Sequence, residues 1–111
     1  MAFSSTLAVN NDTATITLVG ELDASVAQAF RDDVERAAAA HVHTLVINMT
    51  DLTYMSSAGL RALIFAKQKM GSAVDITLAN MHESVKETVE MTGFHHSVTI
   101  VDAYDGDETQ P

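Results

Sequence analysis

Residues 44–60 read TLVINMTDLTYMSSAGL. The nearly continuous apolar run over 43–49 is typical of a central strand that is covered on both faces. Over 57–70 the apolar residues recur at helical spacing, and Gly71 follows them as a stop signal. The stretch therefore predicts a strand that leads through a short turn into a helix, which is the building unit of an α/β fold.

Two strands and a helix are predicted upstream of this stretch. Residues 13–19 (TATITLV) alternate apolar residues with threonines, the period-2 pattern of a half-buried strand. Residues 7–9 are expected to pair with it as an antiparallel hairpin, because the Asn and Asp residues at 10–12 tolerate tight-turn geometry. Residues 24–40 then carry their apolar side chains on one stripe, which predicts an amphipathic helix.

The downstream part repeats the same alternation of strand and helix. Residues 73–78 alternate apolar with polar residues and predict a strand. Asn80, with Glu83 three residues later, predicts a helix start, and Gly93 before an apolar residue predicts a left-handed cap at the end of that helix. Residues 98–101 predict a last short strand.

The predicted order is β-β-α-β-α-β-α-β. Strands joined through helices run parallel by right-handed crossovers. Because three of the strands alternate apolar with polar residues, the helices are expected mainly on one face of the sheet. We therefore predict an α/β fold, a single domain over residues 1–103, with a mixed, mostly parallel β-sheet and helices packed mainly on one face. Residues 104–111 are acidic and are predicted to form a disordered tail.

Charge and cysteine content exclude several classes of function. The chain of 111 residues has 15 Asp and Glu against 6 Lys and Arg, a formal charge of −9, and so acidic a surface repels nucleic acid and anionic membranes. No cysteine is present, which leaves no disulfide, thiol nucleophile or cysteine-based metal site. The first basic residue is Arg31, and no apolar run approaches the ~20 residues that span a bilayer. We expect a cytoplasmic protein.

The turn before residue 57 is where function is expected. Ser56 or Ser57 is predicted to cap the following helix. A nucleophile elbow would need Gly-x-Ser-x-Gly, which is absent because Tyr54 and Met55 precede the serines. A hydrolytic serine is therefore rejected.

Glu21 and Asp23 follow the second strand at the carboxyl edge of the sheet, where open α/β proteins place functional loops. Their alternative role is to cap the first helix and complement its dipole. A phosphate-accepting receiver domain is the weaker interpretation, because Asn48 and Met49 stand where its acceptor Asp would end the central strand.

Metal and nucleotide sites are not expected. The histidines at 41, 43, 95 and 96 lack the i, i+4 spacing that directs two rings at one ion, and no Gly-rich phosphate loop of standard spacing exists. The sequence thus predicts no catalytic residue, no metal and no cofactor.

Four segments together resemble a known family. These are GELD at 20–23, LVINMTDL at 45–52, YMSSAGL at 54–60 and MTGF at 91–94. They are similar to the STAS domain of bacterial anti-sigma factor antagonists, and the resemblance covers nearly the whole chain.

The resemblance implies a phosphorylation switch. Members of this family bind an anti-sigma factor that is also a serine kinase of the histidine-kinase-like ATPase type, and the sigma factor is released. The kinase inactivates them by phosphorylating a serine in the turn before the second helix, and a serine phosphatase reverses this. The resemblance implies that Ser57 corresponds to the family's phosphorylated serine. Ser56 stands in the place of the family's aspartate and is a second candidate acceptor. The implied partner-binding residues are Glu21, Asp23, Asp51, Tyr54, Met55, Ser56, Ser57, Ala58 and Gly59.

Two alternatives stay open from the sequence. One is a constitutive STAS scaffold or transporter accessory domain, in which Ser57 is only a cap. The other is a small nucleotide-binding or hydrolytic protein. We favour the phosphorylation-controlled binding protein, which is not an enzyme.

Overall fold

An antiparallel hairpin begins the sheet. β1 (Ser4–Asn10) pairs with β2 (Thr13–Leu22), and Asn11 in the turn adopts the left-handed conformation, with a φ of 57°. Asn tolerates this conformation better than most non-glycine residues, and the predicted turn is confirmed.

The structure, a computed structural model, describes residues 2–102. The predicted tail over 104–111 and the domain boundary at 103 lie outside these residues.

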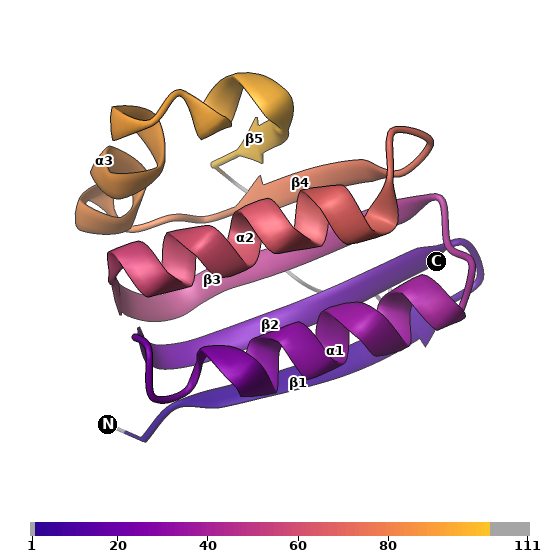
Figure 1. Ribbon diagram of the computed structural model, residues 1–111, viewed down its shortest axis with the longest axis horizontal. Coiled ribbons are helices and arrows are strands. Elements are labelled where there is room, and N and C mark those ends of the chain that lie inside the picture. Colours follow the sequence, from indigo (N-terminus) through magenta and orange to yellow (C-terminus); the bar gives the residue numbers. More distant parts are fainter. Residues whose placement is uncertain (1, 103–111) are drawn as a thin grey trace.

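Three parallel strands extend the hairpin into a five-stranded sheet. β3 (Thr44–Met55) pairs with β2, β4 (Asp75–Ala79) with β3, and β5 (Thr99–Val101) with β4. The strand order is β1-β2-β3-β4-β5, so each new strand is added at the same edge (Figure 1).

The helices are the connections between the parallel strands. α1 (Ala27–Ala39) joins β2 to β3 and α2 (Ser57–Met70) joins β3 to β4; both lie on the same face of the sheet (Figure 1). α3 (Glu83–Met91) and a short 3-10 helix, η1 (Phe94–Ser97), lead to β5. The predicted fold class, a mostly parallel sheet with helices mainly on one face, is confirmed.

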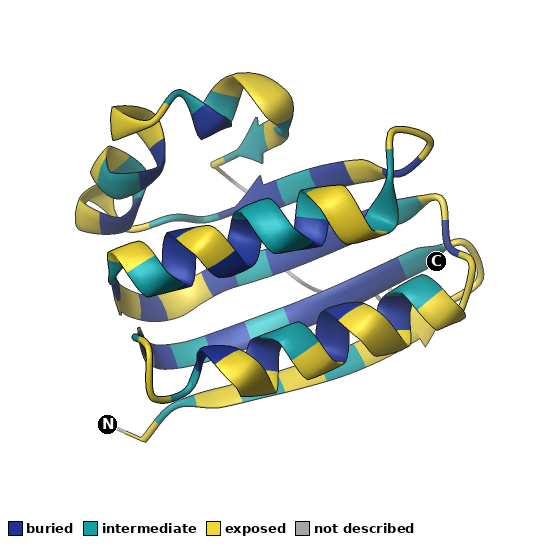
Figure 2. Cartoon of the chain, in the orientation of Figure 1, coloured by how far each residue is buried: buried dark blue, intermediate teal, exposed yellow. Residues whose placement is uncertain are grey.

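The core lies between the sheet and these two helices. Phe30 and Val34 of α1 and Leu63 of α2 meet Leu18 and Ile47 of the sheet, and each is at most 1% exposed. Figure 2 shows the buried positions of α1 and α2 turned toward the strands. Burying a side chain of this size contributes about 1.5–3 kcal/mol relative to leaving it in water.

β3 is longer than predicted. It runs on to Met55 instead of ending at residue 49, and it stays paired with the last part of β2. Register shifts in this pairing, after Thr17 and after Gly20, mark bulges. A bulge breaks the period-2 alternation of a strand, and the buried residues Leu52 and Met55 are accordingly three positions apart. The apolar run over 43–49 therefore gave no sign of the extension.

The predicted start of α1 is wrong. The helix begins at Ala27, because the Asp23 carboxylate accepts hydrogen bonds from the backbone N–H of Ser25 at 2.9 Å and from its hydroxyl at 2.6 Å. This closes a separate turn before the helix. Val26 is the residue at the N-cap and makes no side-chain cap bond. Neither Asp23 nor Glu21, which lies in β2, has the capping role that was considered for it.

α3 also begins later than predicted, at Glu83. Asn80 has a φ of 61°, and its side-chain nitrogen donates to the hydroxyl of Thr50 at 2.9 Å. Its predicted role as a helix cap is wrong, since it ties the loop to β3 instead. The other end of α3 follows the prediction: Gly93 is left-handed, with a φ of 79°, and Phe94 is 8% exposed.

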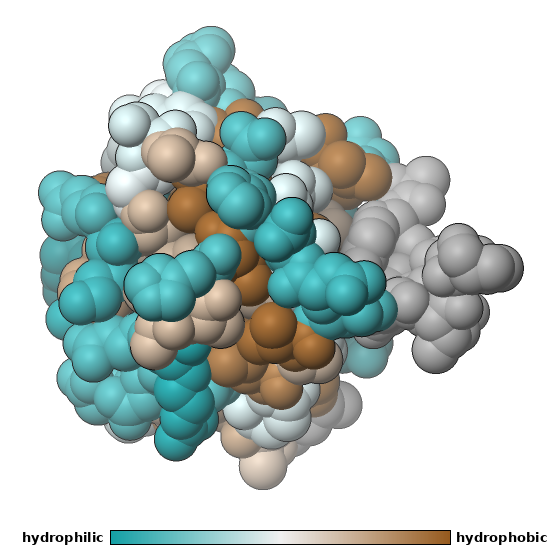
Figure 3. Space-filling view, turned by 90° about the vertical axis from the view of Figure 1, so that its right-hand side faces the viewer, coloured by the Kyte–Doolittle hydropathy of each residue, from teal (hydrophilic) through white to brown (hydrophobic). Residues whose placement is uncertain are grey.

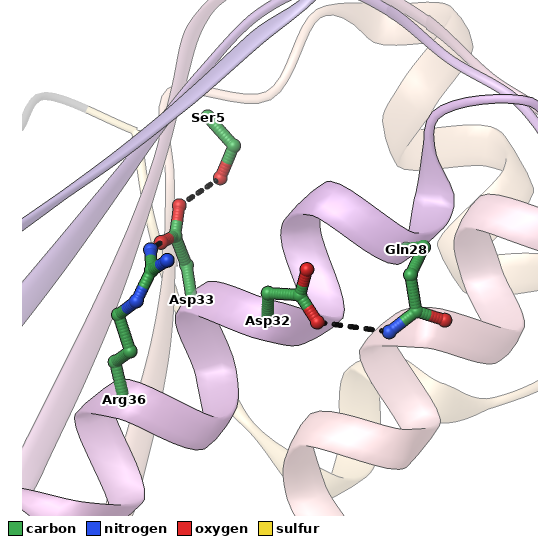
Figure 4. Close-up of polar contacts among 5 residues, drawn as sticks. All are labelled: Ser5, Gln28, Asp32, Asp33 and Arg36. Atoms are coloured by element: carbon green, nitrogen blue, oxygen red, sulfur yellow. Dashed lines mark hydrogen bonds and ion pairs between the residues drawn. The ribbon is translucent and has the colours of Figure 1, made fainter.

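A buried carboxylate holds α1 to the edge of the sheet. Asp33 is 4% exposed, and its two oxygens accept from the Ser5 hydroxyl of β1 at 2.7 Å and from the Arg36 guanidinium at 2.6 Å (Figure 4). The neighbouring contact in Figure 4, from Gln28 to Asp32 at 2.9 Å, lies on the exposed side of α1. Asp33 thereby fixes α1 against β1.

Candidate functional site

The turn between β3 and α2 is built around Ser56. Its backbone N–H donates to the carbonyl of Leu22 at 2.9 Å, which joins the turn to the end of β2. Its hydroxyl accepts from the N–H of Gly59 at 3.3 Å, and its carbonyl accepts from the N–H of Leu60 at 3.0 Å. Of the two serines predicted as caps, Ser56 is the one that caps α2.

Ser57 is left available on the surface. It is the first residue of α2 and is exposed. Its hydroxyl has no hydrogen-bond partner among residues 2–102. The turn therefore presents an unoccupied hydroxyl at the start of a helix, where amide groups and the helix dipole favour negative charge.

Gly59 brings the start of α2 close to both strands. A Cβ at this position would lie 2.6 Å from Cγ of Met55 and 2.9 Å from the carbonyl oxygen of Leu22. Only glycine fits without displacing one of them. Gly59 and Met55 are both buried. They shape the turn from beneath and present no side chain on its surface.

The ends of β2 and β3 place acidic and aromatic side chains beside this turn. Glu21 pairs in register with Tyr54, and Val19 pairs with Asp51. Glu21 and Asp51 are exposed, and Tyr54 is 48% exposed. The structure therefore brings the sequence-predicted residues to one end of the sheet, the left-hand end in Figure 1.

Asp23 and Ala58 complete the set as half-buried residues. The Ser25 hydroxyl and backbone N–H, which both bond the Asp23 carboxylate, hold the pKa of that group below its usual value. Asp23 is thus ionised at neutral pH, and it adds a fixed negative charge next to the start of α1.

Two arginines at this end were not singled out from the sequence. Arg31 of α1 and Arg61 of α2 face a hollow of about 240 Å³ that is also lined by Ala24, Ala27, Gln28 and Ala58. The spacing of Arg61, four residues after Ser57, was the available signal. The role of Arg31 depends on how α1 packs beside α2, which no local pattern contains.

The loop before α3 was also missed as part of this end of the sheet. His82 Nε2 lies 2.7 Å from the carbonyl oxygen of Thr50, and the Ser84 hydroxyl donates to the carbonyl of Thr53 at 3.4 Å. Together with the bond from Asn80, these contacts join the loop and the first turn of α3 to the extension of β3.

A second hollow, of about 270 Å³, lies at the opposite end of the molecule. Its lining is mixed and includes His41, His43, Lys69 and Met70. Figure 3 views this end, where hydrophobic surface runs between hydrophilic side chains. Parallel strands begin here, whereas α/β proteins place their sites at the carboxyl ends of the strands.

Within residues 2–102, no three His, Asp or Glu side chains form a group that could hold a metal ion. None of the helices in the same part of the chain is long and apolar enough to cross a membrane.

Residues 4–106 match the STAS domain family. No curated protein matches the chain at a significant level. Among solved structures, an anti-sigma factor antagonist from Mycobacterium paratuberculosis is 17% identical and superimposes with a TM-score of 0.85, over 94% of this chain and 89% of the other.

The anti-sigma factor antagonist SpoIIAA is similar in two forms. Its unphosphorylated form is 24% identical with a TM-score of 0.72, over 93% of this chain and 90% of the other. Its phosphorylated form, described as a Bacillus cell fate determinant, is 23% identical with a TM-score of 0.71, over 94% and 93%. The family predicted from the four sequence segments is confirmed.

Proposed function

Because the chain belongs to the STAS domain family, we propose that it is an anti-sigma factor antagonist controlled by phosphorylation. It sequesters an anti-sigma factor, which is also a serine kinase of the histidine-kinase-like ATPase type, and so releases a sigma factor. It acts in the cytoplasm by binding and has no catalytic role of its own. The names of the solved structures with the same fold support this proposal.

The observation that carries the proposal is the division of tasks between two serines. The Ser56 hydroxyl caps α2 by accepting from the N–H of Gly59. The Ser57 hydroxyl is exposed and has no partner in the described part of the chain. A hydroxyl that stabilises nothing can be modified without loss of the fold. Ser57 is therefore the proposed acceptor.

Phosphorylation changes the surface more than the fold. The γ-phosphoryl group of ATP passes to the Ser57 oxygen, the serine proton is released, and ADP leaves. The product carries about −1.5 to −2 charge at neutral pH, which the start of a helix tolerates. A partner that packs on this turn must desolvate that charge beside Glu21, Asp23 and Asp51, and this is costly. Release of the kinase follows, and a serine phosphatase restores the binding form.

The partner-binding surface in this proposal consists of the exposed and half-buried residues of the turn and of the adjoining strand ends. Tyr54 supplies its largest apolar area, since it is 48% exposed. Met55 and Gly59 contribute by setting the position of α2. The exposed and half-buried members are Glu21, Asp23, Asp51, Tyr54, Ser56, Ser57 and Ala58.

The test is to incubate the protein with the cognate kinase and ATP and to locate the phosphate by tandem mass spectrometry. We expect one phosphate on Ser57, none in Ser57→Ala, and an unchanged site in Ser56→Ala. Labelling of Ser56 in Ser57→Ala at the wild-type rate would show that Ser56, one residue earlier, is the acceptor. A kinase that binds the protein but labels neither serine would favour a constitutive scaffold, and ATP turnover by the protein alone would favour the enzymatic alternative.

A further inference from the structure

An arginine-lined groove runs from the turn between β3 and α2 along the line between α1 and α2. The hollow that contains Ala58, Arg31 and Arg61 adjoins a larger one of about 450 Å³, which both arginines share with Ile64, Phe65 and Gln68. The guanidinium carbon of Arg31 lies 5.4 Å from the centroid of the Phe65 ring. We call the surface of these two adjoining hollows the arginine groove.

Within residues 2–102 the two arginines have no acidic partner, although the chain has an excess of acids. Of the other basic residues, Arg36 pairs with Asp33 at 2.6 Å and Lys86 approaches Asp102 at 3.9 Å, whereas Lys67 and Lys69 also make no ion pair within residues 2–102. Neither Arg31 nor Arg61 makes a hydrogen bond or ion pair with any residue from 2 to 102. Nε of Arg31 is in addition buried without an acceptor. A buried donor without an acceptor is unfavourable, so the groove is suited to an anion.

Ser57 stands one helical turn before Arg61. Residues at i and i+4 are neighbours on a helix surface, and long helical side chains lean toward the N-terminus, over the preceding turn. Arg61 is exposed and lines the hollow together with Ala58. A group attached to the Ser57 oxygen therefore comes within reach of the Arg61 guanidinium.

We propose that Arg61, assisted by Arg31 from across the arginine groove, binds the phosphate of phosphorylated Ser57 within the same molecule. This inference rests on the proposed function, which supplies the phosphate. Arginine suits the task because its planar guanidinium donates two parallel hydrogen bonds to phosphate oxygens.

The surrounding charges direct the phosphate to this side. The carboxylates of Glu21 and Asp51 lie on the strand ends, and the ionised Asp23 is held in its own turn by Ser25. The carboxylates at the strand ends repel a dianion, while the arginines that line the groove attract it. Phosphorylation thus removes the exposed positive charge of the groove at the same time as it adds negative charge to the turn.

The test places phosphoserine at position 57 during translation and follows its second pKa by phosphorus-31 NMR. Arg61→Gln is expected to raise this pKa by about half a pH unit, because loss of the cation disfavours the dianion. Arg31→Gln should raise it by less, and Arg61→Lys should give an intermediate value. Lys69→Gln, which removes the same charge near the other end of α2, is the matched control and should leave it unchanged.

Equal values in Arg61→Gln and Lys69→Gln would overturn the proposal. An Arg31→Gln value that equals the control would remove Arg31 from the site. The phosphoserine is placed without a kinase, so the result is independent of whether a kinase labels Ser57. Conversely, labelling of Ser57 by a kinase would support the proposed function but would not rescue the arginine site if the NMR test failed.

Discussion

Two adjacent serines at the start of α2 differ because their backbones differ. Ser56 has an extended conformation, with φ −84° and ψ 177°, which allows its hydroxyl to turn back to the N–H of Gly59. Ser57 already belongs to the helix, and its side chain is exposed. The Ser56 hydroxyl thus caps α2, whereas the Ser57 hydroxyl has no hydrogen-bond partner within residues 2–102. This difference can be measured as stability, independently of any partner.

We expect Ser56→Ala to lower the free energy of unfolding by about 1 kcal/mol, because the N–H of Gly59 loses its cap. Ser57→Ala should change it by less than about 0.5 kcal/mol, as is usual for an exposed position. Urea denaturation of both variants and of the wild type provides the comparison. Equal losses in the two variants would mean that the hydroxyls do not have separate roles.

At the level of elements, the position of α1 determines one wall of the arginine groove. α1 has no side-chain cap at its start, and its link to β1 is the buried carboxylate of Asp33. Arg36 is 70% exposed as a side chain, so this ion pair by itself contributes little. The hydrogen bond from Ser5 is the one that joins α1 to β1, since Asp33 and Arg36 both belong to α1.

Asp33→Ala is expected to lower the free energy of unfolding by about 1–3 kcal/mol, because the Ser5 hydroxyl is left without its acceptor. The matched control is Asp32→Ala, which removes an adjacent carboxylate of the same helix whose hydrogen bond is exposed (Figure 4). Asp32→Ala should lower the free energy of unfolding by less than about 0.5 kcal/mol. Thermal melts of both variants would refute this explanation if the two losses were the same.

For the whole molecule, the two ends of the α1 and α2 layer have different roles. The carboxyl ends of β2 and β3 hold the turn with Ser57, and the other end holds the hollow lined by Lys69 and Met70. α2 has 14 residues, which corresponds to a length of about 21 Å at 1.5 Å per residue. A charge introduced at one end of this helix is therefore largely screened at the other end.

We expect Ser57→Asp to weaken binding of the anti-sigma factor at least tenfold, or by about 1.4 kcal/mol, while the domain stays folded. A carboxylate is accepted at a helix start but adds charge where the partner is proposed to pack. Ser72→Asp introduces the same charge at an exposed position beyond the end of α2 and should bind like the wild type. Titration calorimetry measures the affinity and circular dichroism checks the fold. Unchanged affinity in Ser57→Asp would place the interface elsewhere.

Local patterns in the sequence were sufficient for the order of the elements, the hairpin turn at Asn11 and the left-handed Gly93. They were not sufficient wherever a contact between distant segments overrides the local preference. β3 extends past its apolar run because it stays paired with the bulged end of β2. Asn80 resembles a helix cap in sequence, but in the fold it bonds Thr50, 30 positions earlier.

The residues of the candidate site also fall into those that a local pattern identifies and those that depend on contacts between distant segments. The turn around Ser57 is contiguous in sequence, so its motif could be identified there. Arg31 joins it only through the packing of α1 beside α2, and Asp33 depends on Ser5, 28 positions away. Such residues become apparent when the helices are placed on the sheet.

The unequal lengths of the edge strands determine where the domain opens most easily. β5 has 3 residues, against 7 in β1 at the other edge, and a short ladder protects few amides from exchange with solvent. Transient opening therefore costs least at β5 and η1. The turn with Ser57 is joined to β2 and β3 in the interior of the sheet. Ser57, the proposed acceptor, thus lies in a turn that is anchored to the interior of the sheet through Ser56, and a kinase would meet it in its native geometry without waiting for local unfolding.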